Sequence, residues 1–214
     1  MDSRRCIGPF WEFYSPKAQR VVRLRGDLLY YLWILLESDP NYVALCEHPV
    51  SFRTRVGGKW TWAEFHAWAL DAAGEDHFFT VAYRRSLVGG DSKGFCVRQM
   101  YACCLWAEAN NVRYSVSTDQ FIWRQPQLLS NWAYVLRFLN GSFTTADLEL
   151  GDRIGRFVAA TGNTTLGDIK SAFVEVDPTS VEAALFLQIH CGALAADLGT
   201  EALSRKTKIR RIPR

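Results

Sequence analysis

The spacing of apolar residues predicts alternating helices and strands in the N-terminal part of the chain. Residues Gly26–Ser38 (GDLLYYLWILLES) form a strongly apolar run of the length of one core helix, which Asp39-Pro40 ends. Residues Gly94–Asn110 and Gln127–Leu139 have apolar positions at helical spacing. We expect short strands at Asn41–Val50 and Val112–Ser117, a short element at Asp119–Trp123 and irregular structure over residues 1–20.

The stretch Trp60–Arg85 predicts a β-hairpin around which this part of the chain is organised. Residues Trp60–Leu70 alternate large apolar side chains with small or polar ones, Asp71–Asp76 (DAAGED) form a turn cluster, and His77–Tyr83 are β-prone. A further strand, Val50–Val56, ends at Gly57-Gly58, and Leu87–Lys93 predicts a loop. This order of elements is typical of an α/β domain, in which helices flank a sheet.

The pattern changes near Asn140-Gly141-Ser142, where we place a domain boundary between residues 1–140 and 141–214. Three short helices are predicted beyond it, at Thr144–Thr161, Thr165–Val174 and Pro178–Cys191. The second begins at a threonine cap with Asp168 three residues on, and the third begins at Asp177-Pro178. Residues Gly192–Leu198 predict a β-turn or hairpin stub. Three short helices followed by a small wing are typical of a winged-helix domain.

Composition narrows the class of protein. The 214 residues are 49% hydrophobic, which is typical of a globular protein with ample length for a core. We find no apolar run long enough to cross a membrane, and the first residues lack the apolar core of a signal peptide, so we expect a cytoplasmic protein. The six cysteines form no CxxC pair and no zinc-ligand spacing, which favours free thiols in a reducing compartment.

Basic residues are clustered, although the net charge is only +3. Each cluster alone is typical of a solvated surface, but together they suit a polyanion such as DNA. The predicted DNA-binding residues are Arg20, Arg23, Arg25, Arg53, Arg55, Lys59, Arg84, Arg85, Arg205, Lys206, Lys208, Arg210 and Arg211, the last five in a basic tail.

Most of the chain resembles a known family. The matching runs, in family order, are Arg20–Val50, the hairpin with Glu64, Ala107–Leu139 and Val181–Ile212; their most specific parts read ESDPNYVALCEHPV and YSVSTDQFIWRQPQLLSN. These runs resemble the TnsA-like endonuclease subunits of Tn-seven-like heteromeric transposases. The resemblance implies a restriction-endonuclease-like N-terminal domain followed by a winged-helix domain.

The family's catalytic positions are largely replaced in this chain. Its members carry an acid on the first helix, an aspartate on one hairpin strand, and an acid or glutamine, a valine and a lysine on the next, which together hold a divalent ion and steady the attacking water. The matching positions here are Leu29, Glu64, Thr80 and Ala82. Only Glu64 keeps its charge, and a lone carboxylate holds Mg²⁺ poorly. We therefore expect a degenerate nuclease without a metal cofactor.

The resemblance implies a component of a bacterial DNA transposition complex. Such a subunit works beside a DDE transposase, which joins the transposon end, and an AAA+ regulator. We expect the chain to bind transposon-end DNA through phosphate contacts, in the nucleoid when bound. The helix at Pro178–Cys191 is almost wholly apolar or acidic, which argues against insertion into a DNA groove and favours a protein partner.

Two other hypotheses remain open. An active Mg²⁺-dependent endonuclease needs a second metal ligand beside Glu64, for which Glu12, His66 and His77 are the candidates; His66 is expected on the same strand face as Glu64. Arg84 and Arg85 could hold a phosphate without chemistry. A protein domesticated from a transposon for another use is the third hypothesis, and the sequence does not separate it from the first.

Overall fold

The computed structural model of the chain describes residues 8–90, 95–139, 141 and 143–212. The chain forms two compact units: Met1–Phe13, Val21–Leu36 and Asn41–Arg124 belong to unit 1, and Tyr14–Arg20, Glu37–Pro40 and Gln125–Arg214 to unit 2. The boundary expected at 140/141 stays a prediction, because it falls on Asn140 and Ser142, which lie outside the described residues. No helix within the described ranges is long and apolar enough to cross a membrane.

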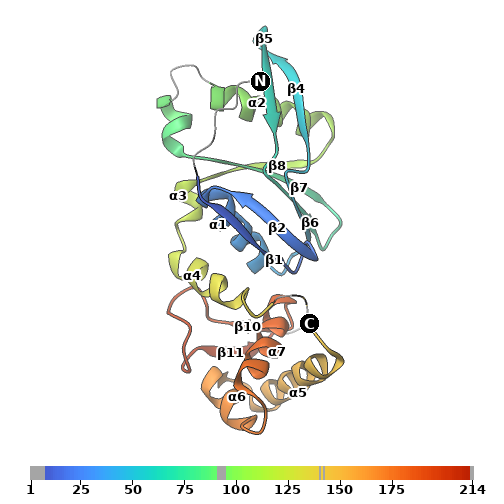
Figure 1. Cartoon of the computed structure of the whole chain (residues 1–214), viewed down its shortest axis with the longest axis vertical. Coiled ribbons are helices and arrows are strands. Elements are labelled where there is room, and N and C mark those ends of the chain that lie inside the picture. Colours follow the sequence, from blue (N-terminus) through green and yellow to red (C-terminus); the bar gives the residue numbers. More distant parts are fainter. Residues whose placement is uncertain (1–7, 91–94, 140, 142, 213–214) are drawn as a thin grey trace. The chain divides into compact units, whose positions relative to one another are not determined.

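A four-stranded mixed sheet forms the centre of unit 1 (Figure 1). Its strands, in spatial order, are β3 (Tyr42–Glu47), β6 (Ala67–Asp71), β7 (Asp76–Ala82) and β8 (Arg113–Thr118). The first three are antiparallel, and β8 runs parallel to β7. The parallel pair requires a crossover, which α2 (Phe95–Ala109) provides. With α1 (Asp27–Ser38) before β3 and α3 (Asp119–Ile122) after β8, the predicted α/β class is confirmed.

A separate two-stranded sheet lies beside α2. It consists of β4 (Ser51–Val56) and β5 (Lys59–Glu64), and Figure 1 shows it extending away from the four-stranded sheet. The turn uses Gly57 and Gly58, both with positive φ, which glycine adopts without steric cost. One face of the hairpin packs on α2, where Val56, Ala63, Phe65, Phe78, Ala102 and Cys103 form a buried core cluster. The hairpin is therefore anchored along one face.

Three secondary-structure predictions for the first 93 residues were wrong. The predicted strand Trp60–Leu70 is two strands, β5 and β6, because Phe65 and His66 leave one sheet and enter the other. Residues 1–20, expected to be irregular, contain β1 (Phe10–Ser15), which pairs with β2 (Arg20–Arg25). The loop expected at Leu87–Lys93 begins as a π-helical turn, Ser86–Gly90; its remainder lies outside the described residues.

Unit 2 contains the predicted helices and one small sheet. Its helices are α4 (Pro126–Val135), α5 (Thr145–Thr161), α6 (Leu166–Ala172) and α7 (Pro178–His190). Its strands β9 (Thr164–Thr165), β10 (Leu194–Ala196) and β11 (Lys208–Arg211) form an antiparallel sheet in the order β10-β11-β9. The caps are as predicted: Thr165 and Asp168 form a capping box, and the Asp177 carboxylate accepts from Ser180 N.

The region expected to be a basic tail is part of this sheet. Strand β11 is its central strand, with Ile209 buried and Lys208 exposed. Helix α7 is part of the core, since no residue from Ser180 to His190 is exposed. The apolar character of α7 therefore reflects packing inside unit 2, which also prevents this helix from entering a DNA groove.

A buried carboxylate joins three segments of unit 2. Glu37 is fully buried; Ser15 Oγ donates to its Oε1, and His190 Nε2 lies 2.9 Å from its Oε2. Nearby, Lys17 Nζ donates to Asp39 O at 2.5 Å, and burial lowers the pKa of Lys17 to about 8, opposed by the charges of Glu37 and Asp39. Lys17 therefore belongs to the interior and not to a basic surface.

Asn131 fixes the segment between β10 and β11, and its replacement should destabilise unit 2. Its Nδ2 donates to Leu198 O and Glu201 O, both at 2.8 Å, and its Oδ1 accepts from Leu203 N at 2.9 Å. Asn131→Asp places a carboxylate oxygen against two carbonyl oxygens. We expect a loss of roughly 2–4 kcal/mol in the free energy of unfolding, measured by urea denaturation.

The exposed Asn163 provides the matched control for this substitution. Asn163→Asp should change the free energy of unfolding by less than about 0.5 kcal/mol. An equal, small effect of both substitutions would show that the Asn131 hydrogen bonds do not hold the segment.

Candidate functional site

The chain changes sheets at Phe65 and His66, and this junction positions Glu64. Phe65 N donates to Val50 O at 3.0 Å, on the β4 side. His66 N donates to Phe79 O at 2.8 Å and His66 O accepts from His48 N at 3.0 Å, on the side of the four-stranded sheet. The fully buried Phe65 ring contacts the rings of Phe52, Phe78, Trp106 and Tyr114. Glu64 is therefore held at the end of β5, where the two sheets meet.

The sequence placed Glu64 on the strand that pairs with His77–Tyr83, but in the structure it lies on β5, outside the β6–β7 hairpin. It pairs with Ser51 of β4, whereas the β6–β7 register ends at Ala67 opposite Phe79. Its side chain is 36% exposed, and its Oε1 lies 3.7 Å from His66 Nε2. The expected proximity of the Glu64 and His66 side chains is thus found. The Glu64 backbone oxygen accepts from Cys103 Sγ at 3.6 Å, which ties this point to α2.

The ring of His66 is oriented against metal binding. Its Nδ1 accepts from Val81 N at 2.9 Å, so the proton of the neutral ring is on Nε2, the nitrogen nearer Glu64. Burial, with a smaller contribution from His48, lowers the pKa of His66 to about 4, so the ring is neutral at pH 7. A protonated Nε2 has no lone pair for a metal, and the Glu64–His66 pair supplies only the carboxylate.

The three positions that match the family's other catalytic groups are buried and uncharged. Thr80 is fully buried, and Leu29 and Ala82 are 3% and 6% exposed. Thr80 Oγ1 lies 2.7 Å from Tyr114 Oη and donates to Met100 Sδ at 2.9 Å.

Burial also keeps Tyr114 and its hydrogen-bond partner Cys103 neutral. It raises the pKa of Tyr114 and raises that of Cys103 to about 12. Thr80, at the position where the resemblance implies an acid or glutamine, thus belongs to a neutral hydrogen-bonded network.

Two other acid or imidazole candidates are engaged elsewhere. Glu12 pairs with Arg23 across β1 and β2, with Oε2 at 3.1 Å from Nε. His77 lies at the turn end of β7, with Nε2 at 3.2 Å from Asp71 Oδ2. Backbone N–H groups of Glu75 and Ala73 and the imidazole of His77 lower the pKa of Asp71, so this pair stabilises the turn.

The free face of the β4–β5 hairpin presents arginine and tryptophan side chains. Arg53 is opposite Trp62 and Arg55 opposite Trp60, and all four are exposed. The guanidinium carbons of Arg53 and Arg55 lie 4.7 and 4.9 Å from the Trp60 ring centroid. Sequence reasoning found the arginines but missed the tryptophans as surface residues. Their alternation with the buried Thr61 and Ala63 was the available signal.

All thirteen predicted DNA-binding residues are exposed. They belong to separate groups: β2, the β4–β5 hairpin, the segment after β7, and the region of β11. Arg84 donates to Gln120 Oε1 and Arg85 lies over the Tyr83 ring, which orients both side chains. Arg205 Nη2 is within 3.4 Å of Ser171 Oγ.

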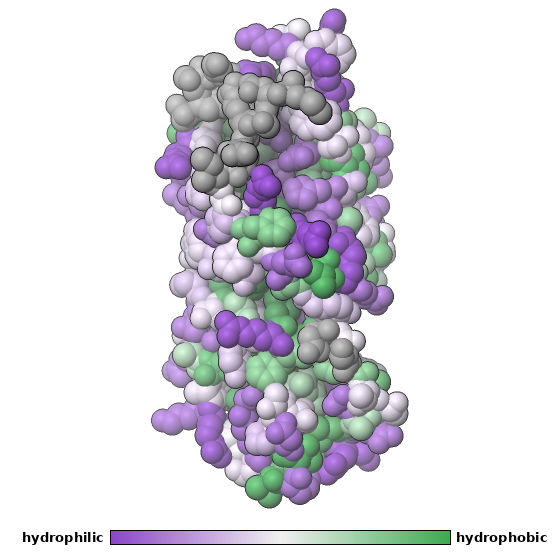
Figure 2. All heavy atoms as spheres, in the orientation of Figure 1, coloured by the Kyte–Doolittle hydropathy of each residue, from purple (hydrophilic) through white to green (hydrophobic). Residues whose placement is uncertain are grey.

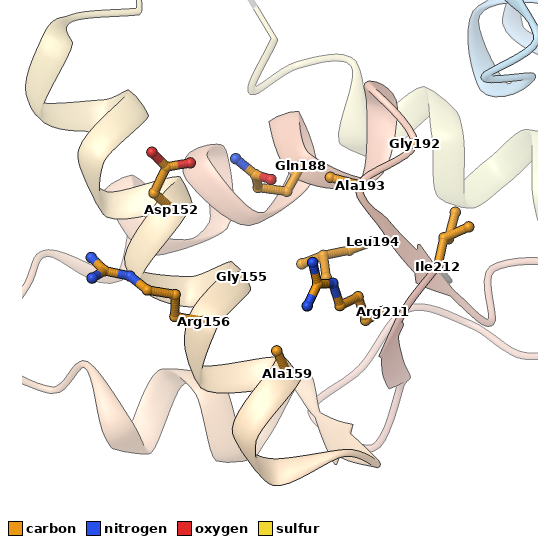
Figure 3. A pocket seen from close by; sticks show the side chains of 10 residues that line it. All are labelled: Asp152, Gly155, Arg156, Ala159, Gln188, Gly192, Ala193, Leu194, Arg211 and Ile212. Atoms are coloured by element: carbon orange, nitrogen blue, oxygen red, sulfur yellow. The ribbon is translucent and has the colours of Figure 1, made fainter. Parts of the chain in front are cut away.

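Unit 2 contains an open pocket of about 540 Å³ between α5 and the β10–β11 sheet (Figure 3). Gly155, Ala159 and Gly192 leave the space, since none has a large side chain. Arg156 and Arg211 line it from different elements, with Asp152 as the acidic residue of the lining. The pocket thus brings Arg211, a predicted DNA-binding residue, together with Arg156, which sequence reasoning missed.

Comparison with protein-family models and with curated proteins finds no match for this chain. Within the described residues, no group of three or more His, Cys, Asp and Glu side chains is arranged to hold a metal ion.

The neutral state of His66 predicts a pH-dependent stability. Its pKa is about 4 in the folded protein and about 6.5 when unfolded, so the unfolded state binds the proton first as pH falls. The contribution is fully present above pH 6.5 and is lost between about pH 6.5 and 4, by roughly 3 kcal/mol.

Replacing His66 by asparagine tests this dependence. His66→Asn keeps an acceptor for Val81 N and removes the titration, so its unfolding free energy should fall less over this pH range, as measured by urea denaturation. An NMR titration of His66 near pH 6.5 would contradict the prediction.

Proposed function

We propose that the chain is a DNA-binding subunit of a bacterial transposition complex, built like a TnsA-like endonuclease whose nuclease site has lost its catalytic groups. The observation that carries this proposal is the composition of the Glu64 site. A single carboxylate lies beside a neutral histidine, and Thr80 and Ala82, which the resemblance matches to the family's other hairpin groups, are buried and uncharged. Such a site can contact DNA but lacks the groups that position an ion and activate water.

The topology of unit 1 supports a restriction-endonuclease-like domain. The order is a helix, three antiparallel strands, a crossover helix and a parallel fourth strand (α1, β3, β6, β7, α2 and β8), with the β4–β5 hairpin inserted between β3 and β6. The runs that resemble the family, Arg20–Val50, the hairpin with Glu64 and Ala107–Leu139, include α1, β3, β6, β7 and β8 but only the last residues of α2. Fold and sequence therefore favour the same assignment, although fold alone does not specify activity.

The topology of unit 2 supports a winged-helix domain. Its elements follow the order α5, β9, α6, α7, β10 and β11, with a three-stranded sheet at one side. Because α7 is buried, partner subunits would contact other elements of this unit. We include contacts with a DDE transposase and an AAA+ regulator in this proposal because the family resemblance implies them.

The distribution of basic side chains supports DNA as the ligand. On the face that Figure 2 shows, hydrophilic and hydrophobic residues are interspersed, and the described residues there form no continuous apolar belt. Exposed arginines and lysines attract a polyanion and release its counterions, so affinity should depend strongly on salt. We place the protein in the cytoplasm, at the nucleoid when bound.

An active endonuclease is the second candidate function, and the favourable observation is Glu64 itself, a partly exposed carboxylate at a sheet junction. It would require a further ligand from DNA or from water, because His66 presents a protonated nitrogen. The domesticated protein remains the third hypothesis and makes the same physical predictions as the first.

Metal titration separates the first two functions. Calorimetric titration of Mn²⁺ and Mg²⁺ into the protein should give no binding heat at millimolar concentrations, and Glu64→Ala should behave identically. Neither protein should cleave transposon-end DNA. Binding that Glu64→Ala abolishes, followed by strand cleavage, would instead establish the active endonuclease.

The salt dependence of DNA binding tests the basic surface. We expect the triple substitution Arg53→Ala, Arg55→Ala and Lys59→Ala to reduce the slope of log affinity against log salt by roughly 2–3, because each lost phosphate contact removes ~0.7–0.9. Fluorescence anisotropy with a labelled oligonucleotide measures this slope.

Arg113→Ala is the matched control for the triple variant. This arginine is 60% exposed but already pairs with Glu75 at 3.4 Å, so its loss should leave the slope almost unchanged. Equal slopes for the wild type and the triple variant would exclude the hairpin from the DNA surface.

A further inference from the structure

The arginine–tryptophan face of the β4–β5 hairpin is a rigid surface. We define this face by Arg53, Arg55, Trp60 and Trp62. The opposite face of the same strands packs on α2, with the Phe52 ring stacked on Trp106 at 6.1 Å and Ala63 fully buried. Because the hairpin is anchored from behind, the exposed side chains are presented on a fixed backbone.

The two tryptophans have a spacing that suits nucleotide bases. Trp60 and Trp62 are 56% and 53% exposed, which is an unusually high exposed fraction for such large apolar side chains. They lie two residues apart on one strand, which corresponds to about 6.6–6.8 Å. This backbone spacing is about twice the 3.4 Å rise per nucleotide of a stacked strand, so the two indoles are spaced to meet alternate bases of one strand.

The arginines add charge at the same place. Both guanidinium groups lie within 5 Å of the Trp60 ring centroid, a cation–π arrangement that orients them and leaves their outer N–H groups available. Such groups bind phosphate oxygens. A face that combines stacking aromatics with cations matches the chemistry of an unpaired nucleic-acid strand, whose bases and phosphates are both accessible.

We propose that this face binds single-stranded DNA, with bases stacked on Trp60 and Trp62 and phosphates held by Arg53 and Arg55. The inference rests on the proposed DNA-binding function and specifies its substrate as unpaired strands, such as a flap or an overhang at a transposon end. Side-chain alternation along β5 continues from Trp60 and Trp62 to Glu64. A strand on this face therefore leads to the degenerate site, which lacks the groups to cut it.

The test compares three oligonucleotide probes of equal length by fluorescence anisotropy: single-stranded oligothymidine, the same backbone with abasic sites, and a duplex. The wild type should bind oligothymidine at least roughly tenfold more tightly than the abasic strand, because only the former can stack. The double variant Trp60→Ala, Trp62→Ala should bind both strands equally. Trp60→Phe, Trp62→Phe should restore much of the preference.

Tyr101→Ala is the matched control, since Tyr101 is an aromatic residue of α2 with 54% exposure. It should keep the wild-type preference, and circular dichroism should show native folding of every variant. A wild type that binds abasic and oligothymidine strands equally, or prefers duplex, overturns the single-strand inference while the DNA-binding function stands. Absence of binding to all three probes overturns the proposed function itself.

Discussion

The structure of unit 1 depends on the two residues at which the chain passes from one sheet to another. The backbone N–H of Phe65 donates to Val50 on the β4 side. The backbone of His66 is hydrogen-bonded to His48 and Phe79 on the side of the four-stranded sheet. The Phe65 ring fills the core between both sheets and α2, and His66 Nδ1 satisfies the N–H of Val81. Buried backbone groups must find partners, and this junction provides them without a continuous strand. Its geometry decides where Glu64 lies and which hairpin face is free.

The same junction explains why the candidate site is chemically poor. Turning the chain at this point buries His66; burial keeps the ring neutral, and the hydrogen bond from Val81 N fixes its tautomer. Thr80, which the resemblance matches to an acid or glutamine of the family, forms a neutral network with Tyr114 and Met100. Replacing such charges by apolar or hydroxyl groups avoids the desolvation of buried ions. The arrangement therefore favours stability over metal chemistry, while the exposed cations outside the site remain suited to DNA.

Unit 2 uses its helix α7 differently from a groove-reading domain. Helix α7 lies in the core, so its apolar residues serve packing and its His190 contacts the buried Glu37 carboxylate. Exposed positive charge is found instead on β11 and around the pocket lined by Arg156 and Arg211. A DNA contact of this unit would thus involve strands and loops and would depend mainly on phosphate charge.

The sequence by itself determined most elements of the fold. Helical spacing predicted α1, α2 and α4, and local caps such as Thr165–Asp168 predicted the start of α6, because these signals lie within a few residues of one another. It also predicted basic residues that are exposed, whereas Glu64 and the replaced catalytic positions stay predictions from the resemblance. Only the tertiary structure decided the split of Trp60–Leu70, the tautomer of His66, the burial of Lys17 and α7, and the exposure of Trp60 and Trp62. These features depend on which distant segments pack together, and alternation along a strand does not say which face is covered.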